Sequence, residues 1–249
     1  MIKLISLFSF ILLCGTAHAA APNLAEVGGT TYQQQFGYNV NAGGGDDVWY
    51  YDNTYPFTVS NSSVIATAST ANDTSTGLGC KTIFVEGIDG DYNFVSETVT
   101  LAGVTSVVLT NSYRRINNAY CATTGSLHTN NGDIMLGVAP LNSSVLAVIA
   151  QSVGRAQQAI YTAPADKQSF LEGWGFSVRN TTAAVALQVR ELSSAWTTVG
   201  VLNAGENSGY VHKAFSSWVR IPRKADLRLR VLSTGVTARV DGGLEIIRK

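Results

Sequence analysis

Apolar and polar residues alternate with a period of two along most of the chain beyond residue 60. In residues 187–190, leucine and valine alternate with glutamine and arginine, and residues 227–231 alternate leucine or valine with arginine. A period of two places successive side chains on opposite faces of a strand, so each segment is expected to have one buried and one solvated face. The pattern predicts an all-β fold, because no amphipathic helical run interrupts it.

Turn residues divide this pattern into two series of strands. Glycine and asparagine, which accept the positive φ of hairpin turns, punctuate the first series at residues 89–91, 102–103 and 130–132. The first series of strands is expected at residues 63–70, 81–88, 93–101, 106–110, 114–122 and 133–139. The second series is expected at residues 159–162, 169–178, 184–191, 196–202, 210–215, 227–232 and 237–247.

The two series predict two β-sandwich or jelly-roll-like modules. These are residues 57–140 and residues 157–249, joined by a bridge at 141–156. Residues 20–56 lack regular periodicity and are interpreted as an extended arm. Because such a segment cannot form its own core, its rings are expected to pack on the following module or on a neighbouring subunit. The rings that could form this contact between subunits are Phe36, Tyr38, Trp49, Tyr50 and Tyr51.

Residues 1–19 follow the pattern of a secretory leader. Lys3 precedes an apolar run at residues 4–13, and small residues around His18 form a cleavage site after Ala19. The run is too short to be a stable membrane span. Cleavage would give a secreted, periplasmic or cell-surface protein, whereas a retained leader would be buried in an assembly.

Composition adds one feature to this picture, an uneven distribution of charge. The chain has 17 Lys and Arg and 17 Asp and Glu, so it offers no general attraction to nucleic acid. Residues 20–140, however, hold ten acidic residues against three basic ones, and residues 212–249 hold three against nine. Either these are separately solvated faces, or oppositely charged ends steer head-to-tail contacts between copies.

Two cysteines and three tryptophans are candidates for particular roles. Cys80 and Cys121 lie in strands of the first module, and an exported chain could pair them; the alternative is two buried thiols. The tryptophans of the second module could line a surface that stacks on glycans or contacts a partner, or they could fill its core. They are Trp174, Trp196 and Trp218.

Candidate catalytic chemistry is sparse. Beyond the leader the histidines are His128 and His212, in different modules, which makes a multi-histidine metal site or a histidine relay hard to build. No catalytic residue, metal or cofactor is therefore expected, and the chain is predicted not to be an enzyme. The remaining enzymatic alternative is a glycan-degrading carboxylate pair, Glu86 and Glu97, facing each other across a hairpin.

Several short motifs occur in a characteristic order over most of the chain beyond residue 35. The motifs are Phe36-Gly37-Tyr38-Asn39, Asp46-Asp47-Val48-Trp49, Val85-Glu86-Gly87-Ile88-Asp89, Glu97-Thr98-Val99-Thr100-Leu101-Ala102-Gly103, Arg114-Arg115-Ile116-Asn117-Asn118-Ala119, Asn131-Gly132-Asp133-Ile134 and Gln158-Ala159-Ile160-Tyr161-Thr162-Ala163-Pro164-Ala165. This succession resembles virion structural proteins of tailed bacteriophages, especially those of marine viromes.

The resemblance implies a component of a phage particle without enzymatic activity. Such a protein would be a head decoration, spike or tail accessory protein, and it would act as a homo-oligomer in contact with other virion proteins. The leader departs from that pattern, since phage particles assemble in the cytoplasm. It supports the alternative, an exported bacterial β-sandwich protein that binds a carbohydrate or a cell surface.

Overall fold

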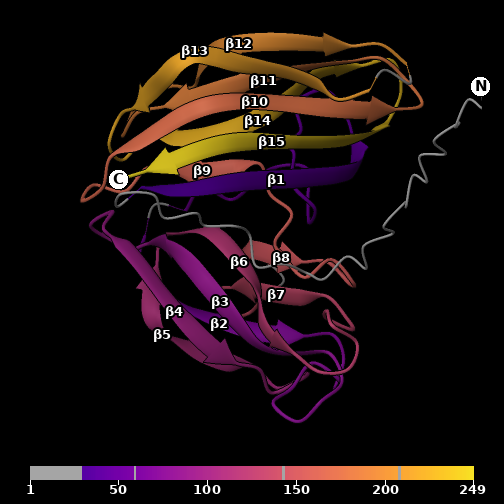
Figure 1. Cartoon of the computed structure of the whole chain (residues 1–249), viewed down its shortest axis with the longest axis vertical. Coiled ribbons are helices and arrows are strands. Elements are labelled where there is room, and N and C mark those ends of the chain that lie inside the picture. The colour runs from indigo at the N-terminus through magenta and orange to yellow at the C-terminus, as the bar shows by residue number, and fades with distance from the viewer. Residues whose placement is uncertain (1–29, 59, 142–143, 207–208) are drawn as a thin grey trace, which may run out of the picture.

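The computed structural model describes residues 30–58, 60–141, 144–206 and 209–249, and the predicted leader lies outside the described residues. Fifteen strands and no helix are present in the described part of the chain, which confirms the predicted all-β fold. The strands form antiparallel sheets grouped in two sandwiches, which lie end to end along the long axis of the molecule (Figure 1). No helix among these residues has the length and apolar character needed to cross a membrane.

The N-terminal sandwich packs a three-stranded sheet, β4-β3-β6, against a four-stranded sheet, β5-β2-β7-β8. Apolar side chains from both sheets, such as Val64, Ile83 and Leu136, form its core. The strands are β2 (Ser62–Ala68), β3 (Cys80–Ile88), β4 (Phe94–Thr100), β5 (Val107–Tyr113), β6 (Arg115–Thr124), β7 (Ile134–Gly137) and β8 (Val145–Ile149).

The C-terminal sandwich packs the sheet β1-β15-β10-β13 against the sheet β12-β11-β14-β9. Its core holds Trp174 and Phe176 from one sheet and the alternating Leu227, Leu229 and Val231 from the other. The strands are β1 (Thr31–Ala42), β9 (Ile160–Thr162), β10 (Ser169–Arg179), β11 (Ala183–Arg190), β12 (Thr197–Ala204), β13 (Val211–Ile221), β14 (Asp226–Thr234) and β15 (Ala238–Arg248).

The interpretation of residues 20–56 as an extended arm is wrong for residues 31–42. Residues 31–42 form β1, which pairs in antiparallel register with β15 and so belongs to the C-terminal sandwich. This strand was not predicted because the inward positions of β1 are polar: Gln33, Gln35 and Asn39 are buried there. The polar sequence therefore did not indicate that residues 31–42 form a strand with one buried face.

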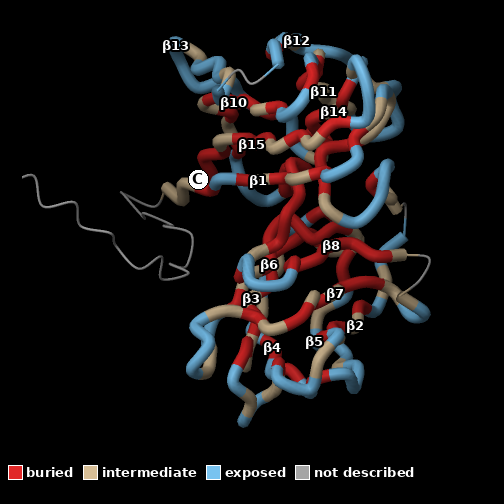
Figure 2. The backbone as a smooth tube through the Cα atoms, turned by 90° about the vertical axis from the view of Figure 1, so that its right-hand side faces the viewer, coloured by how far each residue is buried: buried red, intermediate tan, exposed pale blue. Residues whose placement is uncertain are grey.

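The rest of the arm, together with Phe57, runs between the two sandwiches as residues 43–57. Residues 45–48 pair with β14 beyond the end of β9, through Val48 N–H to Leu229 O at 3.0 Å and Gly45 N–H to Val231 O at 2.7 Å. Trp49 and Tyr55 then fill a small apolar cluster together with Val145, Val148 and Ile160. Figure 2 shows buried backbone continuing through this middle region. We call residues 43–57 the strap.

The predicted bridge at residues 141–156 also differs from the structure. Its apolar part, Val145–Ile149, is strand β8, which is wholly buried and pairs with β7 at the edge of a sheet. A run without alternation is typical of a strand covered on both faces, here by the core of the N-terminal sandwich and by the strap. The N-terminal sandwich therefore extends to residue 149.

The two cysteines of the N-terminal sandwich form a disulfide. Cys80 begins β3 and Cys121 lies in the adjacent β6, with their Cα atoms 5.7 Å apart. Both are buried within the core of this sandwich. Of the two alternatives left open by the sequence, the structure has the paired one.

Candidate functional site

Two edge strands of the C-terminal sandwich lie next to each other at one side of the molecule. β13 ends the sheet β1-β15-β10-β13, and β12 ends the sheet β12-β11-β14-β9. Most residues of β13 are exposed, as are five of the eight in β12. Figure 2 colours both strands largely as exposed. An edge strand presents backbone N–H and C=O groups that another chain can pair with.

Exposed apolar side chains gather on these two strands. Val199 of β12 is 51% exposed and Trp218 of β13 is 46% exposed, and Phe215 is only partly buried. Large apolar groups on an edge strand are unusual, since natural edges normally carry charges that prevent pairing. The exposed apolar residues of the two strands are Val199, Val201, Trp218 and Val219. We call β12, β13 and these side chains the apolar edge.

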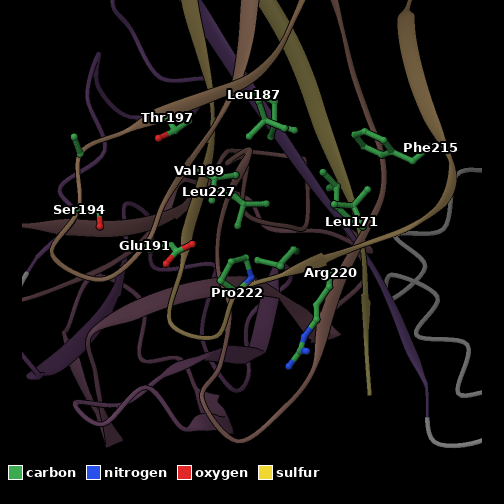
Figure 3. Close-up of a pocket in the computed structure, with 14 residues that line it drawn as sticks. Leu171, Leu187, Val189, Glu191, Ser194, Thr197, Phe215, Arg220, Pro222 and Leu227 are labelled. Atoms are coloured by element: carbon green, nitrogen blue, oxygen red, sulfur yellow. The ribbon is translucent and has the colours of Figure 1, made fainter.

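An apolar cleft opens between the two sheets beneath this edge. It encloses about 400 Å³, and its floor is formed by Leu171, Leu187 and Leu227 (Figure 3). Phe215 and Val219 of β13 and Val199 of β12 form its sides. The sandwich is thus incompletely closed where β12 and β13 separate, which leaves part of its core accessible from the edge.

The three tryptophans do not share a surface. Trp174 is 1% exposed and fills the core, whereas Trp218 lies on the outer face of β13 next to Phe170 and the Lys249 ammonium. Trp196 lies in the loop before β12, with the Arg228 guanidinium 3.9 Å from its ring centroid. The structure therefore contradicts a sugar-stacking surface built from all three, and leaves Trp218 as a candidate partner contact.

The aromatic residues of the predicted arm are also divided. Trp49 is buried beside Tyr55, with ring centroids 5.1 Å apart, so it cannot reach a neighbouring subunit. Tyr38 and Tyr50 stack on each other at 6.1 Å and line a polar groove beside Asp133. Of the five rings, Tyr51 is the exposed one. Phe36 is half-buried on β1. Trp49, Tyr38 and Tyr50 therefore make their ring contacts within the chain.

A buried carboxylate fixes the strap to β14. Asp47, fully buried, lies 3.1 Å from Arg228 and 3.0 Å from Arg230, and it accepts a hydrogen bond from Tyr55 N–H at 2.9 Å. Burial raises the pKa of Asp47, while the two guanidiniums oppose that shift. Burial likewise lowers the pKa of Arg228 to about 10.

A second buried ion pair joins the two sandwiches. Arg248 at the end of β15 donates to Glu86 of β3 at 3.0 Å, and Asn118 of β6 donates to the same carboxylate at 3.3 Å. Next to it, Asn117 exchanges two hydrogen bonds with the Thr162 backbone, at 2.8 and 2.9 Å. The motif at residues 114–119, noted in the sequence without a role, therefore forms the joint between the sandwiches.

These contacts account for part of the uneven distribution of charge. Asp47 and Glu86 belong to the acidic part of the sequence, whereas Arg228, Arg230 and Arg248 belong to the basic part. The two groups neutralise each other inside one chain, across the joint and the strap. Both earlier interpretations are therefore incomplete: these charges are neither solvated faces nor available to steer contacts between copies.

The carboxylate pair considered for glycan hydrolysis is not assembled. Glu86 lies opposite Ser96 and Glu97 lies opposite Val85, so the two side chains project from opposite faces of the β3–β4 hairpin. Glu97 instead accepts hydrogen bonds from the backbone N–H groups of Thr110 and Asn111. Among the described residues there is no cluster of three or more His, Cys, Asp or Glu that could hold a metal ion.

Buried tyrosines predict loss of stability in alkaline solution. Burial raises the pKa of Tyr161 to about 12, and it also raises the pKa of Tyr55 and Tyr113. Above about pH 10 the unfolded chain loses these protons while the folded chain keeps them, so unfolding becomes easier as pH rises, by up to about 1.4 kcal/mol per pH unit per tyrosine. Arg228 has the opposite effect, because its pKa is lowered in the folded state, but it is one group against three tyrosines.

Urea unfolding between about pH 8 and about pH 11, followed by tryptophan fluorescence, checks this expectation, and absorbance of tyrosinate shows when the phenols ionise. Stability should be flat up to about pH 9 and should then fall, with ionisation occurring together with unfolding. A free energy of unfolding that rises across that interval would contradict it.

The fold and these contacts define a class, that of an all-β protein with two sandwiches joined through a buried polar interface. Comparison of the chain with family models, curated proteins and solved structures found no match. The resemblance to virion structural proteins therefore stays a prediction.

Proposed function

We propose that the protein is a non-enzymatic structural subunit that self-associates through the apolar edge, as a surface component of a phage particle. The observation that carries this proposal is the pair of adjacent edge strands with exposed apolar side chains over an open cleft. A second copy of the chain is the occupant that fits best, because it brings the same kind of open edge. Pairing would cover both the backbone groups and the apolar side chains of each copy.

Charge favours one arrangement of the two copies. β13 carries His212, Lys213 and Arg220 and has no acidic residue, whereas β12 has no charged residue at all. An antiparallel β13–β13 pair would bring Arg220 of one copy next to His212 and Lys213 of the other, which is unfavourable. Pairing β13 of one copy with β12 of the next avoids this repulsion. It closes in a two-fold dimer or continues into a larger ring.

The joint between the sandwiches supports a structural role for such a subunit. Glu86, Asn117 and Asp47 hold the sandwiches and the strap together through buried ion pairs and hydrogen bonds. A subunit whose two sandwiches are fixed in this way transmits the geometry of one contact to its far end. Such rigidity is what a repeated particle component requires.

Size measurement tests self-association. The chain without residues 1–19 is expected to be an oligomer by light scattering at micromolar concentration, and Val219→Asp should shift it to a monomer, because a charge on the apolar edge would be buried without a partner. The matched control is Val104→Asp, since Val104 is also exposed, at 63% against 40% for Val219, but lies in the N-terminal sandwich. A monomeric parent protein, or dissociation by both substitutions, would contradict the proposal.

Binding to a surface glycan, as an exported protein, is the second candidate function. The dispersed tryptophans do not support it. A different feature does, namely a groove between the sandwiches that is lined by arginine side chains.

A further inference from the structure

A groove of about 390 Å³ lies where the two sandwiches meet the end of the strap. The N-terminal sandwich contributes Tyr92 and Arg115, together with Arg114 from the residue between β5 and β6. The C-terminal sandwich contributes Arg190, Asp226 and the loop at residues 191–194. Any ligand in this groove contacts both sandwiches at once.

Basic side chains outnumber acidic ones around the groove. Three guanidiniums, those of Arg114, Arg115 and Arg190, line it together with the carboxylates of Glu191 and Asp226. Lys224 adds a fourth cation, since its ammonium lies 5.5 Å from the centroid of the Tyr92 ring. The groove therefore has a net positive charge, which attracts anions.

The carboxylate inside the groove is already engaged. Asp226 is buried, binds Arg190 at 2.5 Å and lies 3.6 Å from Arg115, and it accepts a hydrogen bond from the Thr162 hydroxyl at 2.7 Å. The Asp226 carboxylate therefore neutralises and positions Arg115 and Arg190. Arg114 does not contact this carboxylate; its guanidinium lines the groove and lies 4.6 Å from the centroid of the Tyr92 ring.

Crowding of cations extends behind the groove. Arg190 and Arg228 both lie against the Trp196 ring, at 4.5 and 3.9 Å from its centroid. Burial, together with the nearby charges of Arg230 and Arg190, lowers the pKa of Arg228 to about 10, although Asp47 opposes the shift. An additional anion at the open side would relieve this repulsion between like charges.

The remaining lining groups suit a hydroxylated ligand of moderate size. Thr58, Ser193 and Ser194 provide hydroxyl groups at the wall, and Phe57 and Leu192 provide apolar contact. Ser193 has a positive φ of 65°, which fixes the turn of the loop at the rim. Hydroxyl groups and small apolar surfaces beside guanidiniums match the ring and the carboxylate of a sugar acid.

We propose that this groove binds a uronic-acid unit of an acidic polysaccharide, with its carboxylate held by Arg114 and its ring between the strap and the 191–194 loop. The inference does not depend on self-association through the apolar edge, because the groove is complete within one chain.

Calorimetry with a galacturonic-acid trisaccharide tests the proposal, with neutral galactotriose and inorganic phosphate as comparisons. The trisaccharide should bind, and binding should weaken as salt is raised, because the attraction is between charges. Arg114→Gln should weaken it by about 10-fold or more, since a charge-assisted contact to the carboxylate is lost. Arg179→Gln, which removes an exposed arginine at the far end of β10, should leave it unchanged.

A second variant, Glu191→Gln, tests the charge of the groove through a gain of affinity instead of a loss. Glu191→Gln removes a negative charge from the exposed rim of the groove, so it should tighten binding of the trisaccharide several-fold. The proposal is overturned if the parent protein does not bind the trisaccharide, or if galactotriose or phosphate binds as tightly. It is also overturned if neither Arg114→Gln nor Glu191→Gln changes the affinity. Urea unfolding of each variant confirms that it is folded.

Discussion

Asp47→Ala is expected to lower the free energy of unfolding by about 3–5 kcal/mol, the range for removing one partner of a buried charge pair. The substitution leaves Arg228, itself buried, and Arg230 without their shared carboxylate, and it removes the acceptor of Tyr55 N–H. The strap would then lose its main polar contact with β14. Urea unfolding, monitored by the fluorescence of Trp49 and Trp174, gives the change directly.

Asp52→Ala is the matched control for this prediction. Asp52 lies in the same strap but is exposed. Its carboxylate accepts a hydrogen bond from the neighbouring Asn53 N–H. Replacing Asp52 should change the free energy of unfolding by less than about 0.5 kcal/mol. If Asp47→Ala cost no more than Asp52→Ala, the strap would not be held by this carboxylate.

Glu86→Leu and Arg248→Met are each expected to cost about 3–5 kcal/mol, because each leaves the other charge buried without its partner. The double substitution should recover most of that loss, since two apolar side chains of similar volume can replace a buried ion pair at little cost. The two single variants and the double variant form a thermodynamic cycle that isolates the energy of the pair from other effects of each substitution.

The same cycle reports on the joint between the sandwiches. The parent protein should unfold in a single transition, because Glu86 and Arg248 lie in an interface that the two sandwiches bury together. In the single variants the sandwiches should begin to unfold separately, and two transitions should appear in calorimetry. Single variants that are additive in the double variant, with one transition throughout, would show that the joint does not rest on this pair.

Strand content followed from local sequence, since alternation within each strand reflects its two faces. Residues 227–232, predicted as a strand with alternating faces, are part of β14, and Leu227, Leu229 and Val231 are buried as expected. The turn at Asp89 was also predicted: its carboxylate accepts hydrogen bonds from the N–H groups of Asp91 and Asn93 and so closes the hairpin locally. Strand alternation and hairpin turns depend on residues that are close in the sequence, so they can be predicted from it.

The tertiary structure decided which faces are covered. The arginine face of β14 was expected to be solvated, but Arg228 is buried because the strap, far away in the sequence, lies against it and supplies Asp47. In the same way β1 could not be recognised, because its buried positions hold glutamines and its strand partner β15 lies at the other end of the sequence. Alternation reports that a strand has two faces, and only the packing of distant segments determines what each face contacts.

The candidate sites show the same division. The sequence identified Trp218 and the motif at residues 114–119, yet it could not reveal that Trp218 lies on an edge strand or that Arg115 faces Asp226 across a joint. Trp218, which directly precedes Val219 on β13 and so breaks the alternation, was the available signal for the apolar edge. By itself the sequence determined most of the strands and their turns, with β1 and β8 as the exceptions. The order of strands in each sheet, and with it every edge, groove and ion pair, arose from contacts between residues far apart in the chain, which carry no local signal.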